Sequence, residues 1–174
     1  MLRRTLLLLL LVLGAGVLLL VVEAPPRRTG PQSVRGPRVM RVDAASVRSI
    51  EIRAGERHVV AVRQAGGWQL DHGPAPPGAV EALDALVDSL ARLRAVDAFR
   101  PERGAMLGLD PPAATIMVQT ARRELALRLG TPNVSGGSVY AERAGHPRVF
   151  LVGAGFLSAI ERVLYQTGQR DLTQ

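Results

Sequence analysis

Two kinds of hydrophobic pattern divide this chain of 174 residues. Leu6–Val22 is an unbroken apolar run, whereas the residues after Arg41 alternate between apolar and polar positions at the spacings of strands and helices. As a helix, the apolar run would be about 26 Å long, the short end of what crosses the hydrocarbon core of a bilayer. We therefore predict a transmembrane anchor followed by a separate folded domain.

The first half of the predicted domain reads as a β-meander followed by a helix. Ser49–Arg53 alternates with a period of two residues, and a returning strand at His58–Arg63 follows the turn at Gly55. A third short strand, Trp68–Leu70, comes after two more glycines. Beyond a loop rich in proline, the apolar residues of 80–93 recur at helical spacing and predict an amphipathic helix.

The second half repeats this order. Thr115–Gln119 and Glu124–Leu129 read as strands, and Val139–Glu142 and Arg148–Val152 read as a further hairpin. A closing helix is predicted at Phe156–Tyr165, where apolar residues again share one face. Because short turns join most strands, the pattern favours an antiparallel sheet and the α+β class, with a ββ(β)α internal repeat as a hypothesis.

Composition completes the predicted organisation. Glu23–Met40 contains four prolines and two glycines and is predicted to be a linker. The expected segments are a cytoplasmic N-terminus at 1–5, a transmembrane anchor at 6–22, this linker at 23–40, and one α+β domain at 41–174.

A cleaved signal peptide is the alternative to a retained anchor. Val22 and Ala24 are small enough for the two positions that signal peptidase reads. However, Pro25 and Pro26 follow directly, and the apolar run is longer than the usual hydrophobic region of a signal peptide. We therefore favour a retained anchor.

The net charge of +7 comes entirely from an excess of arginine, and most of this excess flanks the apolar run. From Val42 onward, 15 arginines face 14 acidic residues, so the predicted domain is nearly neutral. This distribution argues against nucleic-acid binding, and an aromatic content of 3% argues against a platform for stacking bases.

The flanking arginines bear on orientation. Arg3 and Arg4 directly precede the run and favour a cytoplasmic N-terminus, although the five arginines that follow the run would by count keep the domain inside. We give more weight to the two residues that adjoin the run. The predicted location is the cytoplasmic (inner) membrane, with a single pass and an extracytoplasmic C-terminal domain.

Residues that could carry chemistry are few. The chain has no cysteine, and its three histidines lack the close spacing of metal ligands. Val149–Gly155 resembles the start of a dinucleotide-binding motif, but Ser158 stands at the third glycine position and only 16 residues follow it. Asp84 and Asp88 share a helix face that points away from the apolar stripe, so we expect both to be solvated. The sequence thus predicts no enzyme activity, no metal and no cofactor.

Several short motifs together resemble DUF4340, a bacterial family described as a domain of unknown function. They are the opening strand at Val47, Ile50 and Ile52, then Trp68–Leu70, Leu90–Leu93, Leu107–Pro111, Leu129–Gly130, Tyr140–Ala141 and Arg170–Asp171. The resemblance would extend from Asp43 to Leu172. It implies a membrane anchor, an extracytoplasmic domain and association with an ABC-type transporter, and it assigns no catalytic residues.

The candidate interaction or structural residues belong to three of these motifs. They are Trp68, Gly108, Leu109, Asp110, Pro111 and Tyr140. Trp68 is expected to fill the core, and the four residues from Gly108 are expected to form a turn.

Two functions are compatible with the sequence. The first is a membrane-tethered extracytoplasmic accessory domain that binds a protein partner, such as a component of an ABC-type transporter, through the open sheet edges expected of meanders. The alternative is a module of the envelope that binds a small molecule or glycan in a pocket near Trp68 and Tyr140.

Overall fold

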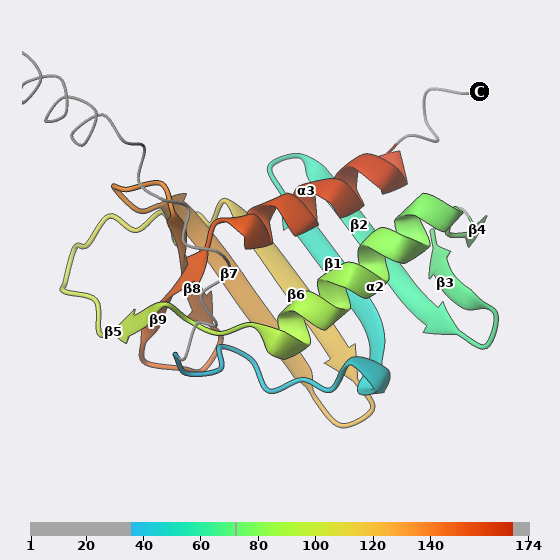
Figure 1. The fold of residues 1–174 in the computed structure, drawn as a ribbon, viewed down its shortest axis with the longest axis horizontal. Coiled ribbons are helices and arrows are strands. Elements are labelled where there is room, and N and C mark those ends of the chain that lie inside the picture. Colours follow the sequence, from blue (N-terminus) through green and yellow to red (C-terminus); the bar gives the residue numbers. More distant parts are fainter. Residues whose placement is uncertain (1–35, 72, 169–174) are drawn as a thin grey trace, which may run out of the picture. The chain divides into compact units, whose positions relative to one another are not determined.

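A computed structural model describes residues 36–71 and 73–168 of the chain. They form an antiparallel sheet of nine strands with two α-helices on one of its faces, which confirms the predicted α+β class (Figure 1). Within the described ranges, no helix is both long enough and apolar enough to cross a membrane. The predicted anchor at Leu6–Val22 lies outside these ranges.

The elements follow the predicted order of a meander and then a helix, twice. The first unit contains η1 (Ala44–Ser46), β1 (Val47–Ala54), β2 (Arg57–Gln64), β3 (Gly67–Leu70), β4 (Gly73–Pro74) and α2 (Pro77–Arg92). The second contains β5 (Asp97–Phe99), β6 (Ala114–Thr120), β7 (Glu124–Pro132), β8 (Ser138–Arg143), β9 (Val149–Gly153) and α3 (Gly155–Gly168). A sequence repeat relating the two units stays a prediction.

One continuous sheet joins the two meanders. Its strand order is β4-β3-β2-β1-β6-β7-β8-β9-β5, so β1 and β6 form the seam between the units. The pattern did not reveal β4 and β5, because strands of two and three residues are too short to show a period. These two short strands end the sheet, and short edge strands offer little backbone for pairing with another chain.

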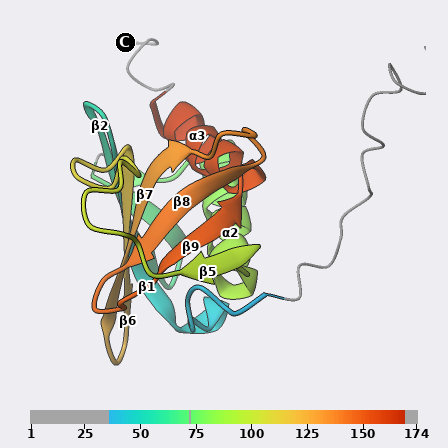
Figure 2. The ribbon, with the colours of Figure 1, turned by 90° about the vertical axis from the view of Figure 1, so that its left-hand side faces the viewer.

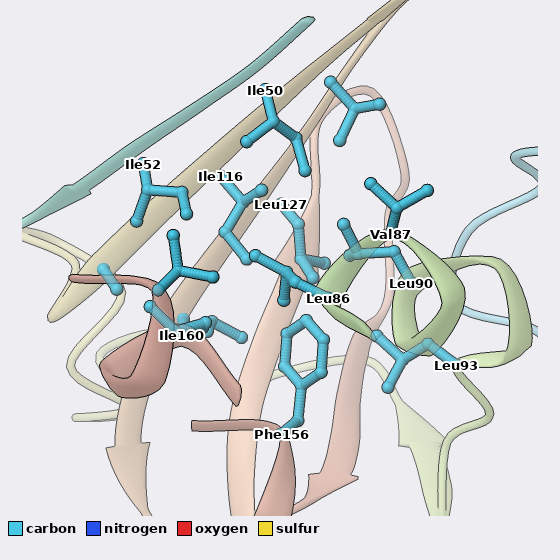
Figure 3. Packing of buried hydrophobic residues seen from close by; sticks show 14 of the residues in the cluster. Ile50, Ile52, Leu86, Val87, Leu90, Leu93, Ile116, Leu127, Phe156 and Ile160 are labelled. Carbon is cyan, nitrogen blue, oxygen red and sulfur yellow. The ribbon is translucent and has the colours of Figure 1, made fainter. Parts of the chain in front are cut away.

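The core lies between the sheet and the two helices. Across the central strands, Ile50 pairs with Val118, and Ile116 pairs with Ile52 and Leu127, which places all five fully buried side chains on the helix face. The helices close this layer with apolar side chains that Figure 3 shows pointing toward the strands. Those labelled there are Leu86, Val87 and Leu90 of α2 and Phe156 and Ile160 of α3.

The core of the domain includes residues that precede its predicted start at Arg41. Val39 and Met40, which composition assigned to the linker, are both fully buried in the core. The N–H of Val39 donates to the carbonyl of Leu93 at 3.0 Å, and the N–H of Ala95 donates to the carbonyl of Pro37 at 2.9 Å. The partner of this segment is the stretch after α2, more than 50 residues away, so local composition could not reveal the pairing. The rest of the predicted linker, 23–35, lies outside the described residues.

Candidate functional site

Trp68 lies at a junction between the sheet and α2, as a core residue. Its side chain is 2% exposed, and its indole N–H donates to Oδ1 of Asp84 at 2.9 Å. Arg63 donates to the same oxygen at 2.5 Å, and its guanidinium carbon lies 4.5 Å from the centre of the indole ring. We call Arg63, Trp68 and Asp84 the Trp68 corner. Asp84 is about half exposed, as expected for a solvated side chain, and its carboxylate also links α2 to β2 and β3.

The turn at 108–111 packs against β7. Gly108 has a φ of +64°, a conformation that favours glycine, and the peptide bond between Asp110 and Pro111 is cis. The N–H of Thr131 donates to the carbonyl of Leu107 at 3.0 Å. A Cβ atom at Gly130 would lie only 2.0 Å from that same carbonyl oxygen, so only glycine fits there. Two motifs of the family resemblance, the turn and Leu129–Gly130, therefore form one backbone contact, which supports a structural role.

Tyr140 lies far from Trp68. Its ring meets Phe99 of β5 edge to face, with 6.2 Å between ring centroids. Tyr140 pairs with Leu151 on the face opposite the helices, while Trp68 lies on the helix face, and four strands separate β3 from β8. The two residues therefore do not line one pocket, contrary to the location expected for a small-molecule or glycan site.

A concave site lies elsewhere, at the end of the sheet where the β6–β7 and β8–β9 turns meet the N-terminal segment. Its volume is about 1070 Å³. It is lined by six arginines, Arg38, Arg41, Arg94, Arg123, Arg143 and Arg148. No carboxylate lines it, and the remaining lining includes His146, Phe150 and Leu125. We call this site the arginine pocket.

Three of these arginines hold the N-terminal segment in place through backbone carbonyls. Arg94 donates to Gly36 at 2.9 Å, Arg143 donates to Val39 at 3.2 Å, and Arg123 donates to Arg41. Within the described ranges, Arg38, Arg41 and Arg148 make no side-chain hydrogen bond, and none of the six arginines forms an ion pair. The pocket therefore collects positive charge that no neighbouring carboxylate balances.

Sequence reasoning missed this pocket. Arg38 and Arg41 were counted with the flanks of the membrane segment, and the other four arginines come from turns and strand ends spread over 94–148. The net charge of the domain is close to zero because acidic residues elsewhere offset these arginines. The net charge therefore gave no sign that arginines gather at one place. The only available signal was that the two turns at 121–123 and 144–148 contain arginine and no acid.

The sheet face opposite the helices shows the reverse arrangement at two places, where charges of opposite sign are paired. Glu51 accepts from Arg53 and contacts Nε2 of His58 at 3.0 Å, and Arg128 lies 3.0 Å from Glu142. Partial burial raises the pKa of Glu51, but the hydrogen bonds from His58 and Arg53 and their charges outweigh this effect. The pKa of Glu51 is therefore lower than the ordinary value for a glutamate.

Metal-binding groups do not gather in the part of the chain that the structure describes. Among residues 36–71 and 73–168, no three or more side chains of His, Asp or Glu lie close enough together to hold an ion. His72, one of the three histidines, lies outside these ranges.

Comparison with known families gives one match. The model of the domain of unknown function DUF4340 matches residues 68–164, more than half of the chain. The chain belongs to the DUF4340 family. The match covers Trp68, the turn at 108–111, Tyr140 and four of the six pocket arginines, but it is shorter than the predicted range of 43–172. No curated protein and no solved structure matches the chain.

Proposed function

We propose that this DUF4340 protein is a membrane-tethered, extracytoplasmic accessory domain that binds a protein partner without catalysing a reaction. The partner we propose is a component of an ABC-type transporter in the same membrane. The proposal combines the apolar run at Leu6–Val22 with the exposed surface of the folded domain.

The main support for this proposal is that the described helices cover one face of the sheet and leave the other face open. Both helices lie on the same face, and none of the described helices covers the other (Figure 2). The register places Met117, Ala126 and Val60 near the middle of this open face, where all three are partly exposed. Glu51 lies between Val60 and Met117 in the same cross-strand row, Arg128 lies two residues after Ala126 on β7, and both charges are paired. Partly exposed apolar side chains beside charges that are already paired form a surface that a protein partner can cover without burying an unpaired charge.

The open face, rather than a sheet edge, is the surface that we assign to the partner. The edge strands β4 and β5 contain two and three residues, too few to pair with an added strand over a useful length. This replaces the sequence-based expectation that open edges would receive the partner.

The proposed tether would keep the domain close to the bilayer. Residues 23–35 separate the apolar run from the first described residue, and a chain of this length reaches at most about 45 Å when fully extended. Confinement of that kind raises the effective concentration of the domain for partners embedded in the same membrane.

Site-specific crosslinking in native membranes tests the proposed face. A photo-crosslinking residue replaces Met117 on the open face in one variant, and exposed Ala85 on α2 in the control. We expect covalent adducts with a transporter subunit from position 117 and few from position 85. Equal yields at both positions, or repeated recovery of the uncrosslinked chain alone from mild detergent, would contradict the proposal.

The proposed orientation has its own test. A reporter that is active only outside the cytoplasm, fused after Gln174, should give signal if the domain is extracytoplasmic. A silent reporter, together with a fluorescent cytoplasmic fusion at the same position, would reverse the orientation.

A further inference from the structure

The arginine pocket points to a ligand that the proposed function does not include. Six arginines from four separate parts of the chain line one concavity of about 1070 Å³, and no acidic residue is among the lining residues. Like charges gathered in this way repel one another, and an anion that enters the pocket relieves that repulsion. We propose that the arginine pocket binds a ligand that carries phosphate groups.

The arginines are arranged to donate hydrogen bonds. A guanidinium has five N–H donors in a planar fork, and the structure uses one from each of Arg94, Arg123 and Arg143 to hold the N-terminal segment. These bonds fix the guanidinium groups while leaving further donors for a ligand. Arg38, Arg41 and Arg148 line the same pocket with no side-chain hydrogen bond to the described residues. Phosphate oxygens match the fork of arginine in two-point contacts.

The volume of the pocket indicates the size of the ligand. Pockets of roughly 300–1,000 Å³ hold drug-sized molecules, so this one exceeds what a single inorganic phosphate would fill. Its wall is not uniformly charged, because Leu125 and Phe150 line it and the ring of His146 lies over Phe150 at 5.0 Å between centroids. The expected ligand therefore has two or more phosphates, or one phosphate attached to an organic group.

Two sources could supply such a ligand: the headgroup of an anionic phospholipid and a free polyphosphate. Pro37, Arg38 and Arg41, which are among the first described residues of the domain, line this pocket. The lipid source rests on the proposed tether, whereas binding of a free polyphosphate does not require it.

The test uses the full chain purified in a neutral detergent at physiological salt. Inorganic triphosphate and a short-chain phosphatidylglycerol are titrated separately, and binding is measured by calorimetry. The test variant is R41Q/R148Q, which removes two arginines that hold no other group. The matched control is R57Q/R103Q, which removes the same charge from two exposed arginines outside the pocket.

We expect the wild-type chain to bind at least one probe and R41Q/R148Q to bind it at least about tenfold more weakly, the loss typical of one or two charged hydrogen bonds. The control should change affinity less than about twofold, because its charges are screened from the pocket. Binding of triphosphate alone assigns a free polyphosphate, and binding of the lipid alone assigns a headgroup.

Two results would overturn the proposal. One is no binding of either probe by the wild-type chain, and the other is an equal loss in both double variants, which would mean that net charge and not the pocket attracts the anion. The single variant R148Q, at the β8–β9 turn, serves in place of the double if R41Q/R148Q does not fold. Because neither probe is a protein, failure here leaves the proposed partner untouched, and failure of the crosslinking experiment leaves the pocket untouched.

Discussion

The Trp68 corner and the arginine pocket use the same residue type in opposite ways. At the corner, Arg63 lies over the ring of Trp68 and forms an ion pair with Asp84. In the pocket, six arginines line one concavity with no carboxylate among the lining residues. Both regions lie on the helix side of the sheet, the corner beside β3 and the pocket toward β8 and β9.

The difference shows how to separate a structural arginine from one available to a ligand. A balanced charge that also packs on a ring contributes to folding, because its removal leaves a carboxylate without its ion pair and an indole ring without the cation above it. The pocket arginines that make no side-chain hydrogen bond to the described residues, Arg38, Arg41 and Arg148, contribute little to folding, since the members of the cluster repel one another. Substitutions in the two regions should therefore affect different properties.

The largest expected effect is that of W68A at the corner. Removing a buried indole leaves a cavity and leaves the apolar stripe of α2 with fewer contacts, so the free energy of unfolding should fall by about 3–5 kcal/mol. Denaturant unfolding of the purified chain, followed by circular dichroism, measures this change. W68F is the control, because it keeps most of the buried volume and should cost clearly less. A loss below about 1 kcal/mol for W68A would mean that Trp68 is not an essential part of the core.

Next in size is the effect of D84A. It leaves the buried indole N–H of Trp68 without an acceptor and removes the partner of Arg63, so we expect a loss of about 1–2 kcal/mol. D88A provides a matched control on the same helix, four residues away. Among the described residues Asp88 pairs with Arg92 alone, and both side chains are more than half exposed, so its loss should stay below about 0.5 kcal/mol. Equal losses in the two variants would remove the distinction between the corner and an ordinary surface pair.

Substitution of pocket arginines is expected to change the free energy of unfolding less, and in the opposite direction. R41Q/R148Q should leave the free energy of unfolding unchanged or raise it by up to about 0.5 kcal/mol, because it relieves repulsion and breaks no side-chain hydrogen bond within the described residues. R63Q should instead lower it by about 1 kcal/mol, through loss of the contact with Trp68 and the bond to Asp84. The comparison fails if the pocket variant is the less stable of the two.

The smallest expected effect on the free energy of unfolding is that of substituting Glu51, whose charge on the open face is paired with Arg53 and His58. Its pKa is lowered in the folded chain, so its contribution to stability is present above the ordinary pKa of glutamate, near 4.5, and is lost as the pH falls through the folded value. E51Q should therefore be less stable than the wild type at neutral pH, and the gap should close in acid. Unfolding curves measured at several pH values give this gap. A gap that stays constant with pH would show that the Glu51 pairing contributes nothing.

Most of the fold was predictable because apolar residues recur at regular spacing in its long strands and helices. Each strand of five or more residues and both helices lie within a few residues of the predicted positions, and Trp68 is buried as expected. The short strands β4 and β5 and the buried segment of Val39 and Met40 were not predictable, because their positions depend on partners distant in sequence.

The sequence by itself determined the class of the fold, the order of its elements and the apolar run that suggests a membrane tether. These are local properties, since hydrophobic period and turn residues act over a few neighbouring positions. The tertiary structure decided which charges meet: Arg63 with Asp84 at the corner, and six arginines without an acid in the pocket. A charge is balanced or unbalanced only by what surrounds it in space, and the order of residues along the chain does not contain that information until the chain has folded.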